Sequence, residues 1–146
     1  MFIEESLKDK LAKFEGIFPT TLDGFLGVEL VHLARDQVLI KLEIKNQHKQ
    51  PFGIMHGGLS LVLAETVSSL GAWFNVEDQT VVGLEINANH IKAVKEGFVF
   101  ASGKPLHIGR STQIWAVDIY NTDDFHNTDK QLVCTSRCTL AILSER

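Results

Sequence analysis

The chain has no surplus of basic residues. Its 14 Lys and Arg residues are outnumbered by 18 Asp and Glu, which gives a formal net charge of −4 at pH 7. A protein that binds nucleic acid needs a basic footprint, so no nucleic-acid partner is expected. Long apolar runs are also missing, and the longest uncharged stretches are too short and too interrupted to cross a bilayer. We therefore expect no membrane partner either.

Cysteine is scarce as well, with only Cys134 and Cys138, both in a segment that is predicted to be a strand. Four residues along a strand span about 13 Å, whereas a disulfide requires Cα atoms within about 7 Å of each other. The N-terminal residues carry acidic side chains and no small-residue cleavage site, which argues against a signal peptide. Free thiols without a secretion signal predict a cytoplasmic location.

Several familiar catalytic motifs are missing. The six histidines are dispersed, and none forms H-E-x-x-H or a comparable ligand spacing, so no metal site is expected. No G-x-S-x-G elbow and no phosphate-loop motif occurs. These absences leave a side-chain carboxylate as the best candidate for a nucleophile or a base.

One carboxylate stands out. Between His56 and Val76, Glu65 is the only charged residue in a run with helical character. Such an apolar helix is normally buried, and a buried carboxylate is costly unless it is paired or kept for chemistry. The alternative is that Glu65 lies on a narrow solvent-facing stripe together with Ser69, its i+4 neighbour.

The pattern of the remaining chain predicts an α+β domain spanning residues 1–146. Helical periodicity covers residues 4–14, and the long central helix covers about 57–74. Residues 20–24 are rich in turn formers and predict a connection. Six strands are expected, at 26–33, 37–44, 80–91, 98–106, 112–120 and 132–143. Short links favour an antiparallel sheet, which we expect to curve around the central helix.

The start of the central helix carries the second candidate group. Gly57 and Gly58 leave room for a ligand near free N–H groups that stabilise negative charge, although they could equally shape the loop-to-helix turn. His56 could polarise a substrate or cap the helix. Gly57 and Glu65 are about 12 Å apart along a helix axis, so one helix cannot aim both at one carbonyl. If both serve one reaction, one must come from another copy of the chain, as in a two-fold dimer.

Three segments carry a resemblance to a known family. They are Gln50 to Gly58 (QPFGIMHGG) followed by Leu63-Ala64-Glu65, then Val81 to His90, then Pro105 to Arg110. The chain resembles the hotdog-fold acyl-CoA thioesterases, in the branch of 4-hydroxybenzoyl-CoA thioesterase and its phenylacetate-degradation relatives. The resemblance covers nearly the whole chain and implies a hotdog fold and hydrolysis of a thioester.

The resemblance also implies roles for individual residues. Glu65 would be the nucleophile or the base that activates water, and the Gly57 N–H would polarise the thioester carbonyl. Gln50 and His56 would help to place that carbonyl, and Ser69 would hold the attacking water or orient the intermediate. A homo-oligomer is implied, in which two chains share each active site and two dimers form a homotetramer. No separate cofactor is expected, because coenzyme A is part of the substrate.

Coenzyme A carries phosphates, so an acidic protein needs a local set of groups to receive it. The resemblance places this set in two stretches, with backbone access at two glycines. Its members are Gly83, His90, Lys92, His107, Ile108, Gly109, Arg110, Ser111 and Thr112. The implied acyl group is aromatic, of hydroxybenzoyl or dihydroxynaphthoyl type. Three alternatives are an aroyl group on a carrier protein, a non-catalytic acyl-CoA-binding module, and a hydratase, which is expected to carry an Asp-His pair that is not apparent here.

Overall fold

The computed structural model describes residues 1–144, so the last two residues of the expected domain lie outside the described part. Helix α3 (Gly57–Phe74) has the bounds that the apolar run predicts. The strands are β1 (Phe2–Ile3), β2 (Glu29–Ala34), β3 (Gln37–Glu43), β4 (Thr80–His90), β5 (Phe98–Ile108), β6 (Thr112–Asn121) and β7 (Gln131–Leu143). None of the helices in residues 1–144 combines the length and apolarity needed to cross a membrane.

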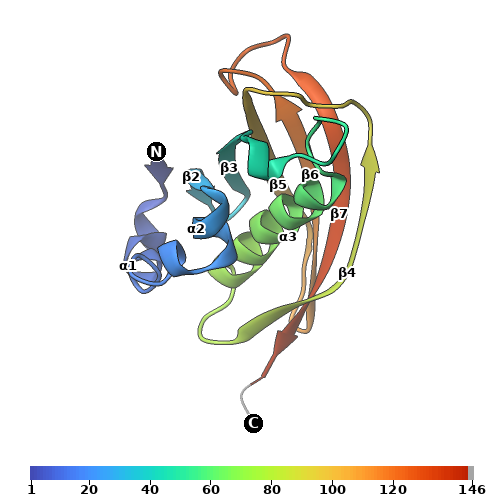
Figure 1. Ribbon diagram of the computed structural model, residues 1–146. Helices are drawn as coiled ribbons and strands as arrows, with labels where there is room; N and C mark the ends of the chain where they lie inside the picture. The colour runs from blue at the N-terminus through green and yellow to red at the C-terminus, as the bar shows by residue number, and fades with distance from the viewer. Residues whose placement is uncertain (145–146) are drawn as a thin grey trace.

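The strands form one sheet in the order β1-β2-β3-β5-β6-β7-β4. Every neighbouring pair is antiparallel except β1 and β2, which run parallel. Helix α3 lies along the inner face of this curved sheet (Figure 1). The expected α+β arrangement, with a curved sheet wrapped around a long central helix, is therefore confirmed.

The contact between α3 and β6 is unusually close. Trp115 on β6 is fully buried, and a Cβ atom at Gly71 of α3 would lie 2.2 Å from its ring. The indole Nε1–H donates to Gln113 Oε1 (3.1 Å), and Gln113 Nε2 donates to the carbonyl of Ala72 (3.3 Å). Because buried polar groups are costly without partners, this chain of hydrogen bonds ties the C-terminal half of α3 to the middle of the sheet.

The N-terminal segment is less regular than the sequence predicts. The helix expected over residues 4–14 is a 3₁₀ turn, η1 (Glu5–Leu7), followed by the short helix α1 (Lys8–Ala12). After Ala12 the chain tightens into i→i−3 hydrogen bonds, from Lys13 N to Lys10 O and from Phe14 N to Leu11 O. The predicted length was therefore wrong, because the α-helical bonding pattern stops where this tighter turn begins.

The segment before β2 also differs from the prediction. A second 3₁₀ turn, η2 (Phe18–Thr20), leads into helix α2 (Leu22–Leu26), where a connection followed by a strand was expected. Gly27 ends α2 in the left-handed conformation (φ 82°), so the strand begins only at Glu29. A third 3₁₀ turn, η3 (Asn46–His48), lies in the loop before α3.

Lys10 fastens this N-terminal segment to the end of α3. Its ammonium group donates to three carbonyls, those of Trp73 (2.7 Å), Val76 (2.5 Å) and Glu77 (2.7 Å), and lies 4.0 Å from the centre of the Trp73 ring. The carbonyls at a helix C-terminus lack intrahelical partners and carry partial negative charge. Phe14 packs edge-on against the same indole at 4.4 Å, so one cation and one ring hold the segment in place.

Strand β4 forms one edge of the sheet and pairs only with β7 among the described strands. It is 11 residues long and mostly exposed, with Leu84 61% and Val82 39% accessible. A long exposed edge strand with apolar side chains is a template for pairing with another chain.

We predict that Lys10→Met lowers the free energy of unfolding by about 1–3 kcal/mol, because it removes three charge-assisted hydrogen bonds and a favourable charge at a helix C-terminus. Urea denaturation measures the change. Lys8→Met is the matched control, since Lys8 makes only an exposed ion pair with Glu5 and should cost at most about 0.5 kcal/mol. Equal losses of unfolding free energy in the two variants would show that the contacts of Lys10 with the end of α3 do not stabilise the fold.

Candidate active site

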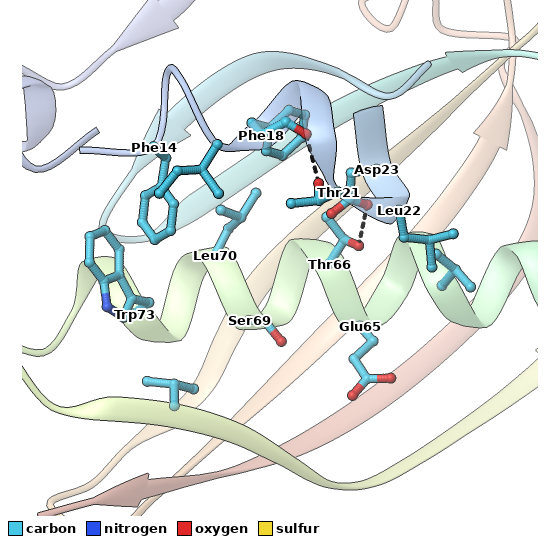
Figure 2. Close-up of a pocket in the computed structure, with 13 residues that line it drawn as sticks. Phe14, Phe18, Thr21, Leu22, Asp23, Glu65, Thr66, Ser69, Leu70 and Trp73 are labelled. Carbon is cyan, nitrogen blue, oxygen red and sulfur yellow. Dashed lines mark hydrogen bonds between the residues drawn. The ribbon is translucent and has the colours of Figure 1, made fainter. Parts of the chain in front are cut away.

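Glu65 and Ser69 project from α3 toward β4 (Figure 2). In the protomer Glu65 is exposed and Ser69 is half-buried. The alternative of a solvent-facing stripe is therefore correct, and the expectation that Glu65 is buried was wrong. The Glu65 carboxylate nevertheless has a defined neighbour in Gly83 of β4. A Cβ atom at Gly83 would lie 2.3 Å from Glu65 Oε1, so this glycine leaves the space that the carboxylate occupies. Close approach to a side chain is thus an observed reason for glycine at position 83.

Glu65 and Ser69 line a cavity of about 470 Å³, hereafter the Glu65 cavity. The N-terminal segment forms one wall of this cavity (Figure 2). Val81 of β4 also lines it. Three aromatic rings contribute, those of Phe14, Phe18 and Trp73. The remaining lining residues are Ile17, Thr21, Leu22, Asp23, Val62, Thr66 and Leu70.

The N-terminus of α3 borders a separate cavity of about 320 Å³, hereafter the Gly57 cavity. It brings together Gln50, Gly57, His90 and Lys92, which come from a loop, the helix, the end of β4 and the segment after β4. The His90 ring is so close to the helix that a Cβ atom at Gly57 would lie 2.9 Å from His90 Nε2. The structure therefore joins His90 to the groups expected to hold the carbonyl.

His56 caps α3. Its Nδ1 accepts a hydrogen bond from the Gly58 N–H (2.9 Å). The capping interpretation is thus confirmed, and it has a chemical consequence. A neutral imidazole that accepts at Nδ1 carries its proton on Nε2, so the cap leaves the exposed His56 ring with an N–H donor for a ligand.

The two cavities lie at different levels of one rigid helix. Gly57 and Glu65 are separated by eight residues of uninterrupted α-helix, or about 12 Å of axial rise. Gln50, Gly57 and His90 line one cavity, whereas Glu65 and Ser69 line the other. Within one protomer the structure therefore does not bring the two halves of the expected catalytic set together.

The residues expected to receive coenzyme A are divided in the same way. The β5–β6 hairpin carries His107 to Thr112. Thr112 pairs with Ala141 of β7, and Ala141 pairs on its other side with Val82 of β4, so the hairpin lies at the Val82 end of β4. His90 is paired with Cys134, at the other end of β4. Val82 and His90 are eight residues apart, about 26 Å along a strand. In one protomer His90 and Lys92 thus lie at the opposite end of the sheet from the hairpin and Gly83.

The hairpin itself is tightly built. The Gly109 N–H donates to the carbonyl of Thr112 (2.9 Å), and Ile142 N donates to the carbonyl of Ser111 (2.9 Å). A Cβ atom at Gly109 would lie 2.5 Å from His107 Nε2, so the imidazole lies over the turn. His107, Ile108, Arg110 and Ser111 are exposed.

The thiols are poor nucleophiles here. Burial, with a smaller contribution from the negative charge of Glu65, raises the pKa of Cys138 to about 11. Burial also raises the pKa of Cys134. Because the thiolate is the reactive form, both groups are held in the unreactive state. Among residues 1–144, no three His, Cys, Asp or Glu side chains gather closely enough to hold a metal ion.

The contributors to the Glu65 cavity that were missed from the sequence include Asp23 and Phe18. Asp23 was placed in a turn-rich connection, and Phe18 was assigned to no element. The structure places both residues in the irregular wall that covers α3. A possible signal was the apolar and aromatic content of residues 14–26, which exceeds what an exposed connection needs.

Comparison with known proteins supports a thioesterase. Residues 52–124 match the family model described as "Thioesterase superfamily". A protein named 1,4-dihydroxy-2-naphthoyl-CoA hydrolase from Listeria monocytogenes is 44% identical over 126 residues, which cover 86% of this chain and 98% of the relative.

Solved structures agree. A thioesterase from Haemophilus influenzae superposes with a TM-score of 0.81 at 35% identity, covering 92% of this chain and 90% of that one. A Staphylococcus aureus protein, with a TM-score of 0.77 at 35% identity and covering 84% of this chain and 98% of its own, was solved with alanine in place of a glutamate. The same protein was solved with alanine in place of a glutamine, and the two positions are as far apart in sequence as Gln50 and Glu65. By its sequence relatives and its hotdog architecture, this chain belongs to the thioesterase superfamily and is a thioester hydrolase.

Proposed function

We propose that the protein hydrolyses an aromatic acyl-CoA to the free acid and coenzyme A. The observation that carries this proposal is the Glu65 cavity, in which one carboxylate faces an apolar space walled by aromatic rings. A volume near 470 Å³ is within the range of small-molecule sites and suits an aromatic acyl group. The Listeria relative is named for an aromatic acyl-CoA, which supports the same substrate class.

We further propose that the working unit is a dimer formed through β4. Antiparallel pairing of two β4 edges about an axis near Ile86 and Asn87 would place Gly83 opposite the partner's His90. An axis perpendicular to the sheet keeps both α3 helices on the same face. The partner's Gly57 would then approach Glu65, because Gly57 lies against His90 and Glu65 lies against Gly83.

The same pairing would reunite the groups proposed to receive coenzyme A. It would bring the partner's His90 and the partner's Lys92 to the end of the sheet where the His107–Thr112 hairpin lies. Two separations within the protomer are thus removed by one two-fold axis, which supports a shared site. Assembly of two such dimers into a homotetramer stays a prediction.

In this site the chemistry requires few groups. The partner's Gly57 N–H would hydrogen-bond to the thioester oxygen and stabilise the negative charge that develops on it. The partner's Gln50 and the exposed His56 N–H donor of the partner would position the same carbonyl. Ser69, one turn from Glu65, would hold the attacking water or orient the intermediate.

Two routes for Glu65 are open. In the first, the carboxylate attacks the carbonyl carbon, the C–S bond breaks, and the thiolate of coenzyme A leaves and takes up a proton. Water then cleaves the resulting anhydride to regenerate Glu65 and release the acid. In the second, Glu65 removes a proton from a water molecule while the water oxygen attacks the carbonyl carbon. The C–S bond then breaks, and the proton passes from Glu65 to the departing sulfur.

We predict that Glu65→Gln lowers kcat by at least about a hundredfold, because the amide can neither attack nor accept a proton. Release of free thiol should be followed with aroyl-CoA, fatty acyl-CoA and aroyl-carrier-protein thioesters. Glu96→Gln, on an exposed loop, is the control and should keep the wild-type rate. Near-normal turnover by Glu65→Gln would reject the role of this carboxylate.

We predict that Gly83→Ala lowers kcat at least about tenfold with little loss of stability, because the new methyl group displaces Glu65 Oε1 from its place. The displaced group is the free end of an exposed side chain, so the fold can accommodate the change. Gly16→Ala is the matched control, since its Cβ would have no atom within 4 Å. An unchanged kcat in Gly83→Ala would show that the contact does not position the carboxylate.

A shared site makes a separate prediction about mixed subunits. Glu65→Gln and Gln50→Ala homodimers should both be slow, but exchange between them creates dimers in which one of the two sites has both groups intact. Recovered activity should approach about a quarter of the wild-type rate at full exchange, because half of the dimers are mixed and each has one intact site. Mass spectrometry confirms the exchange, and proven heterodimers without recovery would count against the shared site.

A further inference from the structure

The wall of the Glu65 cavity contains a second carboxylate, that of Asp23. The other residues of segment 14–23 that line the cavity are apolar or aromatic, apart from Thr21, whose hydroxyl donates to the carbonyl of Phe18 (2.7 Å). Figure 2 shows Asp23 on the opposite side of α3 from Glu65, above Thr66. Thr66 follows Glu65 directly, so Asp23 and Glu65 flank the same turn of the helix and the same stretch of the cavity.

Only half of the Asp23 carboxylate is used within the protomer. Thr66 Oγ1 donates to Asp23 Oδ1 (2.7 Å). No ion pair within residues 1–144 includes Asp23, and no other hydrogen bond to its side chain is present there. Asp23 lies in the first turn of α2, but its carboxylate does not cap that helix, and neither does the side chain of Thr21 at the N-cap position. The second oxygen, Oδ2, is therefore available as an acceptor.

The surroundings make this free oxygen significant. Asp23 is half-buried, and burial raises the pKa of its carboxyl above the ordinary value, while the Thr66 hydroxyl partly opposes that change. A half-buried carboxylate oxygen that lacks a hydrogen-bond donor is costly, and Oδ2 is such an oxygen. Docking of α2 on α3 does not account for the group, because a neutral acceptor would satisfy Thr66 equally well.

We propose that Asp23 is a specificity residue that accepts a hydrogen bond from a hydroxyl group on an aromatic acyl chain bound in the Glu65 cavity. The inference rests on the proposed function, because it assumes that the acyl group of the thioester enters this cavity. Thr66 fixes one carboxylate oxygen and so directs the other. An unsubstituted ring leaves Oδ2 without a partner, so the site favours hydroxylated over unsubstituted aroyl thioesters.

The test compares benzoyl-CoA with the 2-, 3- and 4-hydroxybenzoyl-CoA isomers. In the wild-type protein, kcat/KM for at least one hydroxylated isomer should exceed that for benzoyl-CoA about tenfold or more. The double variant Asp23→Leu/Thr66→Val replaces the polar contact between α2 and α3 by an apolar one of similar size. In this variant the ratio should fall to within about twofold of unity.

Two further variants separate recognition from docking. Asp23→Asn keeps an acceptor for Thr66 but presents an amide N–H₂ in place of Oδ2, so the ratio should fall even if the double variant does not fold. Leu22→Ala shortens an exposed apolar side chain of the same wall. It should lower kcat/KM for all four substrates by a similar factor and leave the ratio unchanged. Thermal melting of each variant reports how far the wall remains folded.

The outcomes are distinct. Loss of the hydroxyl preference in the Asp23 variants, with its retention in Leu22→Ala, supports the inference. A wild-type protein that hydrolyses these thioesters without any such preference overturns the inference and leaves the proposed function standing. So does an Asp23→Asn variant that slows all four substrates equally. Absence of thiol release from every thioester tested defeats the proposed function, and the inference with it.

Discussion

The packing of α3 against the sheet fixes the positions of Glu65, Ser69 and the Gly57 N–H. The missing side chain at Gly71 lets the Trp115 ring lie against the helix backbone, and the hydrogen bonds through Gln113 hold the helix in that orientation. Glu65 and Ser69 are thereby directed toward the edge strand β4, where they line the cavity that the N-terminal segment covers (Figure 2). A rotation of the helix would bury Glu65 among apolar residues of the core, at a high energetic cost.

The same rigidity explains why one chain is insufficient for the proposed chemistry. A straight helix keeps its N-terminal amides and Glu65 about 12 Å apart, and no local movement of side chains closes that distance. The proposed chemistry therefore requires a second chain, and the exposed edge of β4 is a surface on which two chains can pair. The strand is long and apolar at Val82 and Leu84, and it carries both Gly83 and His90, the residues that touch Glu65 and Gly57.

The regular elements could be predicted from the sequence because each has one dominant period. The uncharged run gives α3 its bounds, and alternation gives β4 to β7 within one or two residues. The features that the sequence pattern did not predict depend on contacts between distant strands. In β7, strict alternation of side chains would put Leu132 on the same face as Cys134. A shift in the pairing of β6 with β7 instead matches Leu132 with Tyr120 and Cys134 with Ile119, which puts Leu132 on the opposite face.

The N-terminal wall shows the same limit more clearly. Periodicity at residues 4–14 predicts a helix of ordinary length, but the segment follows the shape of the surface that it covers. Lys10 donates to backbone carbonyls at the end of α3, and Asp23 accepts from the Thr66 hydroxyl, so both contacts join residues more than 40 positions apart in the sequence. Periodicity within a short segment carries no information about contacts between residues so far apart in the sequence. Glu65 and Gly57, by contrast, could be singled out from the pattern along one helix, whereas the roles of Gln50 and Ser69 were implied by the family resemblance.

The structure thus divides the site into a rigid part and an adjustable part. Glu65, Ser69 and the Gly57 N–H belong to a helix whose opposite, core-facing side is buried, so substitutions on that buried side disturb the fold. The wall that we propose to face the acyl group consists of short turns held at two points, by Lys10 at one end and by the Asp23–Thr66 contact at the other. Substitutions at the exposed Ile17 and Leu22 of this wall alter the cavity without changing the buried core. Selectivity for the acyl group is therefore expected to reside in residues 14–23, and the capacity to cleave a thioester in α3.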